Sequence, residues 1–323
     1  MTTMPSPPVA PRGAPDTSGL PGLTGADTDV GIGLWRTARR RLRRSPTAVA
    51  GAVIVLAFVV VAVTAPWLSS YRPGCTQWAD QVTPSSVPGP GTGHPLGLDR
   101  FGSDLLTQLV YGARQSLVLG LVSTLIGLAV GAALGIVAGG FATIGGRLGG
   151  WVDNTVMRLV DIMLAIPGLL LAVSIAALLG QNPLAVMLAV GAAQVPIFAR
   201  LLRGSMLAQG RTDYVLAANA LGLRKRRIVM GHVLPNSIGP TIVQATLTLA
   251  TAIIEVASLS FLGLGQSDPA AAEWGRMLVA AQDRFDVAPR LALLPGLAIA
   301  VTALGFTLLG EALREALDPR SSR

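Results

Sequence analysis

Long apolar runs without a charged residue recur along this chain, and they limit the folds that are open to it. The clearest is Pro46–Leu68, which is preceded by an arginine-rich stretch, WRTARRRLRR. A helix of more than 20 such residues is long enough to cross a hydrocarbon core of about 30 Å. Charged residues make up 13% of the chain, about half the share in an average soluble domain. The chain is therefore expected in a membrane, without a large soluble core.

Five further apolar runs predict five more membrane spans. They cover residues 116–140, 152–179, 184–202, 238–264 and 291–309. The runs 152–179 and 184–202 have a proline well inside them, Pro167 and Pro196, which a span tolerates when neighbouring groups satisfy the freed carbonyl. Residues 101–113 are expected as a short amphipathic helix along the interface. The fold class predicted is all-α: a polytopic membrane protein with six transmembrane helices.

The second span carries glycines, several of them four residues apart: Gly120, Gly127, Gly131, Gly135 and Gly139. This spacing lets helix backbones approach closely. We interpret these glycines as helix-packing positions rather than as a ligand site.

The lysines and arginines predict the orientation of the spans. If the N-terminus is cytoplasmic, the segments 1–45, 141–158, 200–236 and 310–323 face inward, and they hold 19 of the 25 basic residues. The positive-inside rule therefore places both termini in the cytoplasm. A cleaved signal peptide is a weaker interpretation of the first run, which is too long and starts too far from residue 1.

The predicted organisation has five parts. These are a disordered, basic cytoplasmic tail (1–45), a first transmembrane helix (46–68), an extracytoplasmic loop with the interfacial helix (69–113), a five-helix core (114–312) with a cytoplasmic loop at 204–236, and a cytoplasmic tail (313–323). A single cysteine, Cys75, and two distant histidines, His94 and His232, exclude an intramolecular disulfide and give no metal site.

A polar, basic segment, residues 213–236, interrupts the apolar pattern: DYVLAANALGLRKRRIVMGHVLPN. Its first part predicts a short helix over residues 214–221, and Gly222 follows where a helix end favours positive φ. A second short segment, 224–233, is expected to end at Pro235. Helix, turn and basic helix also suggest DNA binding, but the segment is short and topology already explains its arginines. A plain cytoplasmic loop is the other alternative.

The order YVxAAxxLG followed by HxLPN resembles the cytoplasmic coupling segment, or "EAA" loop, of permeases in binding-protein-dependent ABC importers. Further stretches resemble the dipeptide/oligopeptide/nickel branch, second-subunit type. They include HPLGLDRFGSDLLTQLVYGARQSL (94–117), SLSFLGLG (258–265), EWGRML (273–278) and LREALDPR (313–320). The resemblance covers roughly residues 94–320, although Leu216 stands where the family carries glutamate and Asn219 where it usually carries arginine.

The resemblance implies a type I permease fold in a prokaryotic cell membrane, driven by partners. These would be a homologous second permease, two ATPase subunits that bind ATP and Mg, and an extracytoplasmic solute-binding protein. The chain itself has no G-x-x-x-x-G-K-[ST] phosphate loop, so it is expected to be no enzyme, to hold no cofactor and to bind no nucleic acid. The residues expected to couple it to the ATPase are Asp213, Tyr214, Ala217, Ala218, Leu221, Gly222, Leu234 and Pro235.

Two acidic residues within the spans are candidates for a translocation path, Glu255 and Asp161, because ionisable residues in a membrane are usually functional. For Asp161 a local ion pair with Arg158 is the competing interpretation, and for Glu255 a structural ion pair or headgroup contact. The runner-up function is a stand-alone secondary transporter or channel, which would show an inverted repeat or paired intramembrane charges. The substrate stays open among dipeptides, oligopeptides, nickel chelates and glutathione.

Overall fold

The structure is a computed structural model, and it describes residues 42, 45–69, 71–268 and 271–317. Within these ranges the chain is helical, with three isolated β-bridges in the loop before the second span. Five helices are long and apolar enough to cross a membrane, and a bent pair brings the number to six. The predicted all-α class is confirmed. Most of the expected N-terminal tail, and residues 318–323, lie outside the described residues.

The first span is α2 (Pro46–Leu68), with the bounds that the sequence predicts. Ser45 caps its N-terminus by accepting a hydrogen bond from the backbone N–H of Ala48. The helix packs on α11 (Arg290–Leu317) and on α3 (Leu105–Ile144). At Gly51 a Cβ would lie 2.7 Å from the backbone nitrogen of Leu309 on α11, so the glycine permits close contact.

The second span differs from the prediction. The expected interfacial helix at 101–113 and the span at 116–140 form one continuous helix, α3, of 40 residues. Asp104 caps it, accepting from the backbone N–H and the hydroxyl of Thr107. No proline or helix-ending glycine follows until Gly145, which has φ +77°. At about 1.5 Å per residue, α3 is roughly 60 Å long and extends beyond the hydrocarbon core.

The glycines of α3 pack closely against α6 (Pro183–Gln209). A Cβ at Gly131 would lie 2.5 Å from the carbonyl oxygen of Val195, and one at Gly135 would lie 2.8 Å from that of Ala199. Gly127 and Gly139 contact α6 in the same way, whereas Gly120 contacts Ile253 of α9 (Leu234–Phe261). The interpretation as packing glycines is confirmed, because at each of them a neighbouring helix occupies the space that a side chain would need.

The third span is broken, which corrects the expectation of one helix over 152–179. The chain forms α4 (Gly146–Ala165) and α5 (Gly168–Leu179), which bend by 93° at the break. Ile166 and Pro167 are extended, with ψ of 128° and 130°. A proline ring disfavours helical geometry in the residue before it, and Gly168 adds flexibility that a helix does not favour.

The remaining elements extend past their predicted ends. Helix α6 continues to Gln209, so the first residues of the expected loop 204–236 are helical, and Pro196 is accommodated inside it. The last helix, α11, continues to Leu317, into the region expected as a tail. Between α9 and α11 lies the short helix α10 (Trp274–Gln282), and η2 (Ala79–Gln81) lies in the loop after α2.

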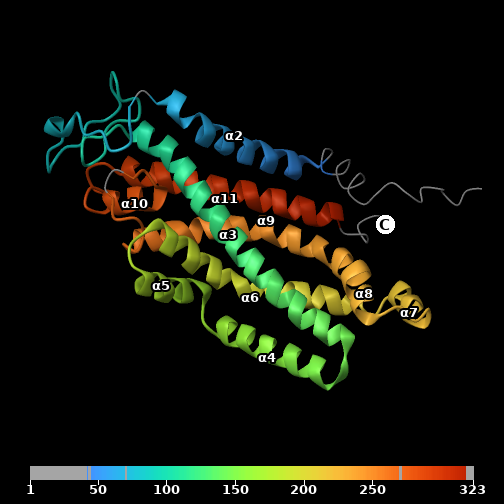
Figure 1. The fold of residues 1–323 in the computed structure, drawn as a ribbon. Helices are drawn as coiled ribbons and strands as arrows, with labels where there is room; N and C mark the ends of the chain where they lie inside the picture. The colour runs from blue at the N-terminus through green and yellow to red at the C-terminus, as the bar shows by residue number, and fades with distance from the viewer. Residues whose placement is uncertain (1–41, 43–44, 70, 269–270, 318–323) are drawn as a thin grey trace, which may run out of the picture.

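The two ends of the helix bundle differ in content (Figure 1). One end carries the start of α2, the end of α11 and the short helices α7 (Asp213–Ala220) and α8 (Lys225–Ile228). The opposite end carries the loop of residues 71–104 and α10. This arrangement agrees with an even number of crossings, and it places the polar segment on the same side as both chain ends of the described helices.

Candidate functional site

The polar segment folds as a helix that ends in a glycine turn. Helix α7 covers Asp213–Ala220, as predicted to within one residue, and Asp213 places its carboxylate in the first turn, where it complements the helix dipole. At the other end the N–H of Leu223 donates to the carbonyl of Ala218, and that of Gly222 to Asn219. This pattern is a Schellman motif. Gly222 has φ +74°, so the predicted turn is confirmed.

The second part of the segment does not end at Pro235, which corrects the prediction. Helix α8 passes through η3 (Val229–Val233), one turn of π-helix, directly into α9. Pro235 lies in the first turn of α9, directly after this π turn. The wider π turn accommodates an interruption of the regular hydrogen-bond ladder, so the polar segment and the fifth span are mechanically continuous.

One face of the segment packs into the chain. Val215 and Ala218 of α7 are 1% and 7% exposed, and they form a cluster with the end of α6. The buried members of this basal cluster are Leu202, Met206, Val215, Ala218, Ile228, Val229 and Val233. The sequence predicts that Ala218 faces a partner, but its side chain is packed inside the chain. The basal cluster fixes α7 to the ends of α6 and α9, so these parts are expected to move together.

The other face of α7 is open. Tyr214 is 41% exposed, Leu216 57% and Leu221 82%, and Ala217 and Gly222 are also exposed. The Tyr214 hydroxyl donates to Gln209 Oε1 at 2.7 Å, which fixes its ring on the surface. Large apolar side chains exposed at a polar end of a protein indicate a contact with another protein. We call Tyr214, Leu216, Ala217 and Leu221 the α7 surface.

Four basic residues follow the α7 surface along the chain. Arg224, Lys225, Arg226 and Arg227 are all exposed. Lys225 has a structural contact as well, because its ammonium donates to the carbonyl of Ile144 at the end of α3, at 2.6 Å. Leu234 is half-buried against the basal cluster, and Pro235 is exposed. The predicted coupling residues thus gather at one end, some on the open face and some beneath it.

The acidic residues of the spans have different surroundings. Asp161 of α4 pairs with Arg200 of α6, and not with Arg158 as the local alternative had it. Asp153, eight residues earlier on α4, accepts two hydrogen bonds from Arg203, at 2.9 and 2.6 Å. These two pairs join α4 to α6. Sequence reasoning missed Asp153 and Arg203, since residues 50 apart give no local spacing signal.

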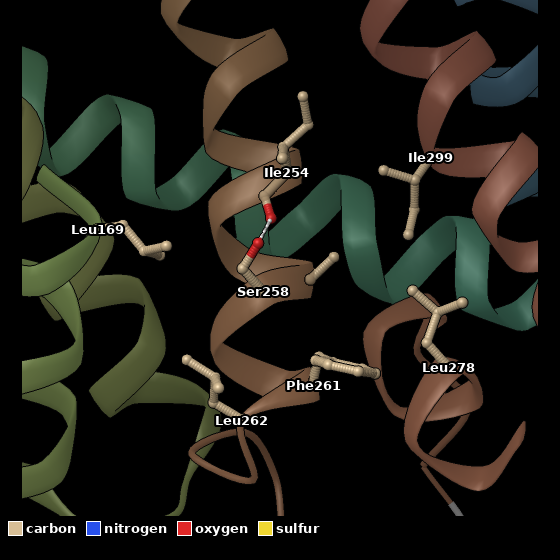
Figure 2. Close-up of a pocket in the computed structure, with 8 residues that line it drawn as sticks. Leu169, Ile254, Ser258, Phe261, Leu262, Leu278 and Ile299 are labelled. Atoms are coloured by element: carbon tan, nitrogen blue, oxygen red, sulfur yellow. Dashed lines mark hydrogen bonds between the residues drawn. The ribbon is translucent and has the colours of Figure 1, made fainter. Parts of the chain in front are cut away.

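Glu255 has no ion-pair partner in the described ranges, and it lies beside Gln194 of α6. An apolar groove of about 380 Å³ opens next to it, between α5, α9, α10 and α11 (Figure 2). Leu169 from α5 faces Ile254 and Ser258 of α9 across this groove. Asp161 and Glu255, the two candidates for a path, contact different parts of α6.

Two carboxyl groups outside the spans are buried at the end opposite the α7 surface. Glu273 caps α10 by accepting from the N–H of Gly275 at 3.0 Å, and burial raises its pKa. Burial also raises the pKa of Asp99 in the loop 71–104, although the N–H groups of Ser103 and Phe101 donate to this carboxyl and oppose the shift. Both groups hold loops against the helices.

Comparisons with known protein families match two stretches of the chain. Residues 131–323 match the family described as "Binding-protein-dependent transport system inner membrane component", and residues 33–84 match the "N-terminal TM domain of oligopeptide transport permease C".

Curated relatives match over nearly their full length. The chain is 39% identical over 294 residues to a dipeptide transport system permease protein of Alkalihalophilus pseudofirmus, covering 91% of this chain and 92% of the relative. It is 37% identical over 286 residues to a glutathione transport system permease protein of Pectobacterium atrosepticum, covering 88% and 91%.

Solved structures share the fold. Two crystal forms of the inward-facing MetNI methionine ABC transporter match with TM-scores of 0.53 and 0.52, at 21% and 23% identity. They cover 65% and 66% of this chain, and 96% and 98% of the matched chains.

Proposed function

The chain belongs to the family of binding-protein-dependent transport system inner membrane components, and from this premise we propose that it is the permease subunit of an ATP-driven importer for short peptides or a related solute such as glutathione. Its relatives carry dipeptide and glutathione transport in their names. The proposed partners are a homologous second permease, two ATPase subunits that bind ATP and Mg, and an extracytoplasmic solute-binding protein.

The α7 surface is the proposed contact with an ATPase subunit, and its geometry carries the proposal. An exposed apolar patch is joined through the basal cluster to α6 and α9. A force applied at Leu221 would therefore reach two spans directly. Closure of the ATPase dimer would shift α7 and change which side of the membrane the spans open to.

The position where the family carries a glutamate also belongs to this proposed contact. Leu216 stands there and is 57% exposed, so the contact at this point is apolar rather than ionic. Asp213, in the first turn of α7, is exposed and supplies a carboxylate three residues earlier. We propose that the cognate ATPase groove receives Leu216 and Leu221 on apolar side chains.

Copurification with the ATPase subunits tests the coupling role. Leu221→Asp should lower the amount of ATPase recovered with the membrane complex and reduce peptide uptake into proteoliposomes in parallel. Met230→Asp adds the same charge at another exposed apolar residue, 55% exposed and outside the α7 surface, and should leave both unchanged. Full coupling in the Leu221→Asp complex would place the contact elsewhere.

The stand-alone transporter is tested on the same material. Proteoliposomes that hold the two permeases without ATPase subunits should take up no peptide when ATP is enclosed with them. Uptake by this preparation would exclude an ATPase-driven importer.

A further inference from the structure

Seven of the ten polar residues of α9 lie on one line along the helix. They are Ser237, Thr241, Gln244, Thr248, Thr251, Glu255 and Ser258. The spacing alternates between four and three residues, which keeps them on one helix face. Thr241 and Thr248 are 3% and 2% exposed, whereas Thr251 is exposed and Glu255 half-buried. The line therefore leaves the protein interior as it approaches Glu255.

Glu255 is set apart by its lack of a counter-charge. The two aspartates of α4 each pair with an arginine of α6, but no lysine or arginine in the described part of the chain pairs with Glu255. A lone carboxylate inside a membrane is costly, and such residues are retained for function. The Oε2 atom of Glu255 is buried and has no hydrogen-bond partner.

Gln194 adds an independent observation. Its side chain is 2% exposed and lies beside Glu255, yet neither its Nε2 nor its Oε1 makes a hydrogen bond of normal geometry. Buried amides are almost always paired. The Glu255 carboxylate and the Gln194 amide are adjacent, and Oε2 of the first and Oε1 of the second are acceptors that receive no hydrogen bond from the described part of the chain.

Small residues surround this pair. A Cβ at Gly127 of α3 would lie 2.8 Å from the Cβ of Gln194 and 3.3 Å from its Oε1. Gly168, at the start of α5 after the bend, lies on the other side, where a Cβ would be 3.8 Å from Oε1 of Glu255. The break between α4 and α5 thus brings backbone, rather than a bulky side chain, next to the carboxylate.

The apolar groove is lined by close sequence neighbours of Glu255 and Gly168 (Figure 2). Ile254 precedes Glu255 in sequence, Ser258 follows one turn later, and Leu169 follows Gly168. Phe261 and Leu262 extend the groove toward the end of α9. The Ser258 hydroxyl donates to the carbonyl of Ile254, so it offers the groove little free polarity. A carboxylate and a neutral amide thus lie next to residues that line an apolar groove.

We propose that Glu255 and Gln194 bind the positively charged amino group of the transported solute, and that the adjacent groove receives its apolar side chain. An ammonium group has three N–H donors and a positive charge, which match the two unpaired acceptors and the missing counter-charge. The solute class is therefore an amphiphile with a free primary amine, such as a short peptide with an unblocked amino terminus. This proposal rests on the proposed function, and it adds which chemical group of the solute the permease recognises.

Direct binding to the membrane complex tests the site without the selectivity of the solute-binding protein. The complex of both permeases and the ATPase subunits is placed in lipid nanodiscs. Binding of radiolabelled alanyl-phenylalanine is compared with that of its N-acetylated form at pH 7.5. The wild type should bind the free amine at least about tenfold more tightly, since a charge-assisted hydrogen bond distinguishes the two.

Two variants locate the preference. Glu255→Gln keeps the shape of the side chain and should bind both peptides equally weakly. Thr246→Val replaces a hydroxyl of α9 that lies off the polar line and donates to its own helix, and it should keep the wild-type preference. A tenfold preference that survives in Glu255→Gln, or a wild type that shows no preference or no binding, overturns the proposal.

The same preparation separates this site from the general function. ATPase activity stimulated by peptide-loaded binding protein, and peptide uptake after reconstitution, are measured on the wild type. If both are present without an amine preference, the importer stands and the site is wrong. If the wild type shows no ATP-dependent uptake, the proposed function itself fails.

Discussion

Arg203 of α6 binds Asp153 of α4 through two parallel hydrogen bonds, Nε to Oδ1 at 2.9 Å and Nη2 to Oδ2 at 2.6 Å. Asp153 is 7% exposed, so its charge depends on this partner. Together with the Arg200–Asp161 pair, the Arg203–Asp153 pair joins α4, the first half of the broken span, to α6. Helix α6 in turn packs along α3.

Loss of one partner of this pair should be strongly destabilising. Arg203→Ala leaves the Asp153 carboxylate buried without a counter-charge, which costs about 3–5 kcal/mol. The thermal midpoint of the purified complex should fall clearly. Arg314→Ala is the control, because the Arg314–Glu311 pair is 3.9 Å long with side chains 69% and 51% exposed, and exposed pairs contribute about 0–1 kcal/mol.

A double variant tests the reason for that loss. Replacing both partners with apolar residues, Arg203→Met with Asp153→Leu, should recover most of the stability, since no buried charge remains. If the double variant is as unstable as Arg203→Ala, the pair stabilises the complex by another route.

Gly131 should not tolerate even one added methyl group. Gly131→Ala places a Cβ 2.5 Å from the carbonyl oxygen of Val195 and 2.7 Å from the Cβ of Phe198. Helices α3 and α6 must then separate, at a cost of about 1–3 kcal/mol. Gly204→Ala is a matched control on α6 with open space around it, and it should be neutral or slightly stabilising. Thermal unfolding of the purified chain in detergent measures both, and equal midpoints would contradict the packing interpretation.

Glu273 should make stability fall as pH rises. Burial raises its folded-state pKa above the ordinary value of 4.5. Below pH 4.5 both folded and unfolded chains hold the proton. Between that pH and the folded pKa the unfolded chain releases it and the folded chain does not, so stability is lost as pH rises.

The pH dependence is measured by thermal midpoints across this window. Glu273→Gln cannot titrate and keeps an acceptor for the Gly275 N–H, so its midpoint should decline less with pH than that of the wild type. Glu311→Gln, on an exposed turn of α11, controls for the loss of one carboxylate. A steeper decline in Glu273→Gln would contradict a raised pKa of Glu273 in the folded chain.

The single cysteine provides a test of orientation. Cys75 lies in the loop at the end opposite the α7 surface and is half-buried. A membrane-impermeant maleimide should label it in intact cells. In a Cys75→Ser chain that carries Leu221→Cys, labelling should require permeabilised cells, because the α7 surface is proposed to be cytoplasmic. The opposite pattern would invert the topology.

Several features could be predicted from the sequence because they depend on local chemistry. The bounds of α2 follow from an apolar run between Ser45 and Ser69, and the α7 helix and its turn follow from short-range propensities and Gly222. The order of motifs also sufficed for the family, which the matched residues 131–323 confirm. The roles of the residues on the α7 surface and of Glu255 remain predictions.

The length and apolar character of its runs alone indicated that this chain crosses a membrane many times, because a helix of about 20 mostly apolar residues fits the hydrocarbon core of a bilayer. Only the tertiary structure decided that Asp161 pairs with Arg200 rather than with Arg158, that α4 and α5 bend apart at Pro167, and that Ala218 is buried while Leu221 is exposed. These outcomes depend on which helix packs beside which, and on how closely the glycines of α3 let α6 approach. Contacts between residues tens of positions apart have no local pattern, so they arise only when the helices are packed together.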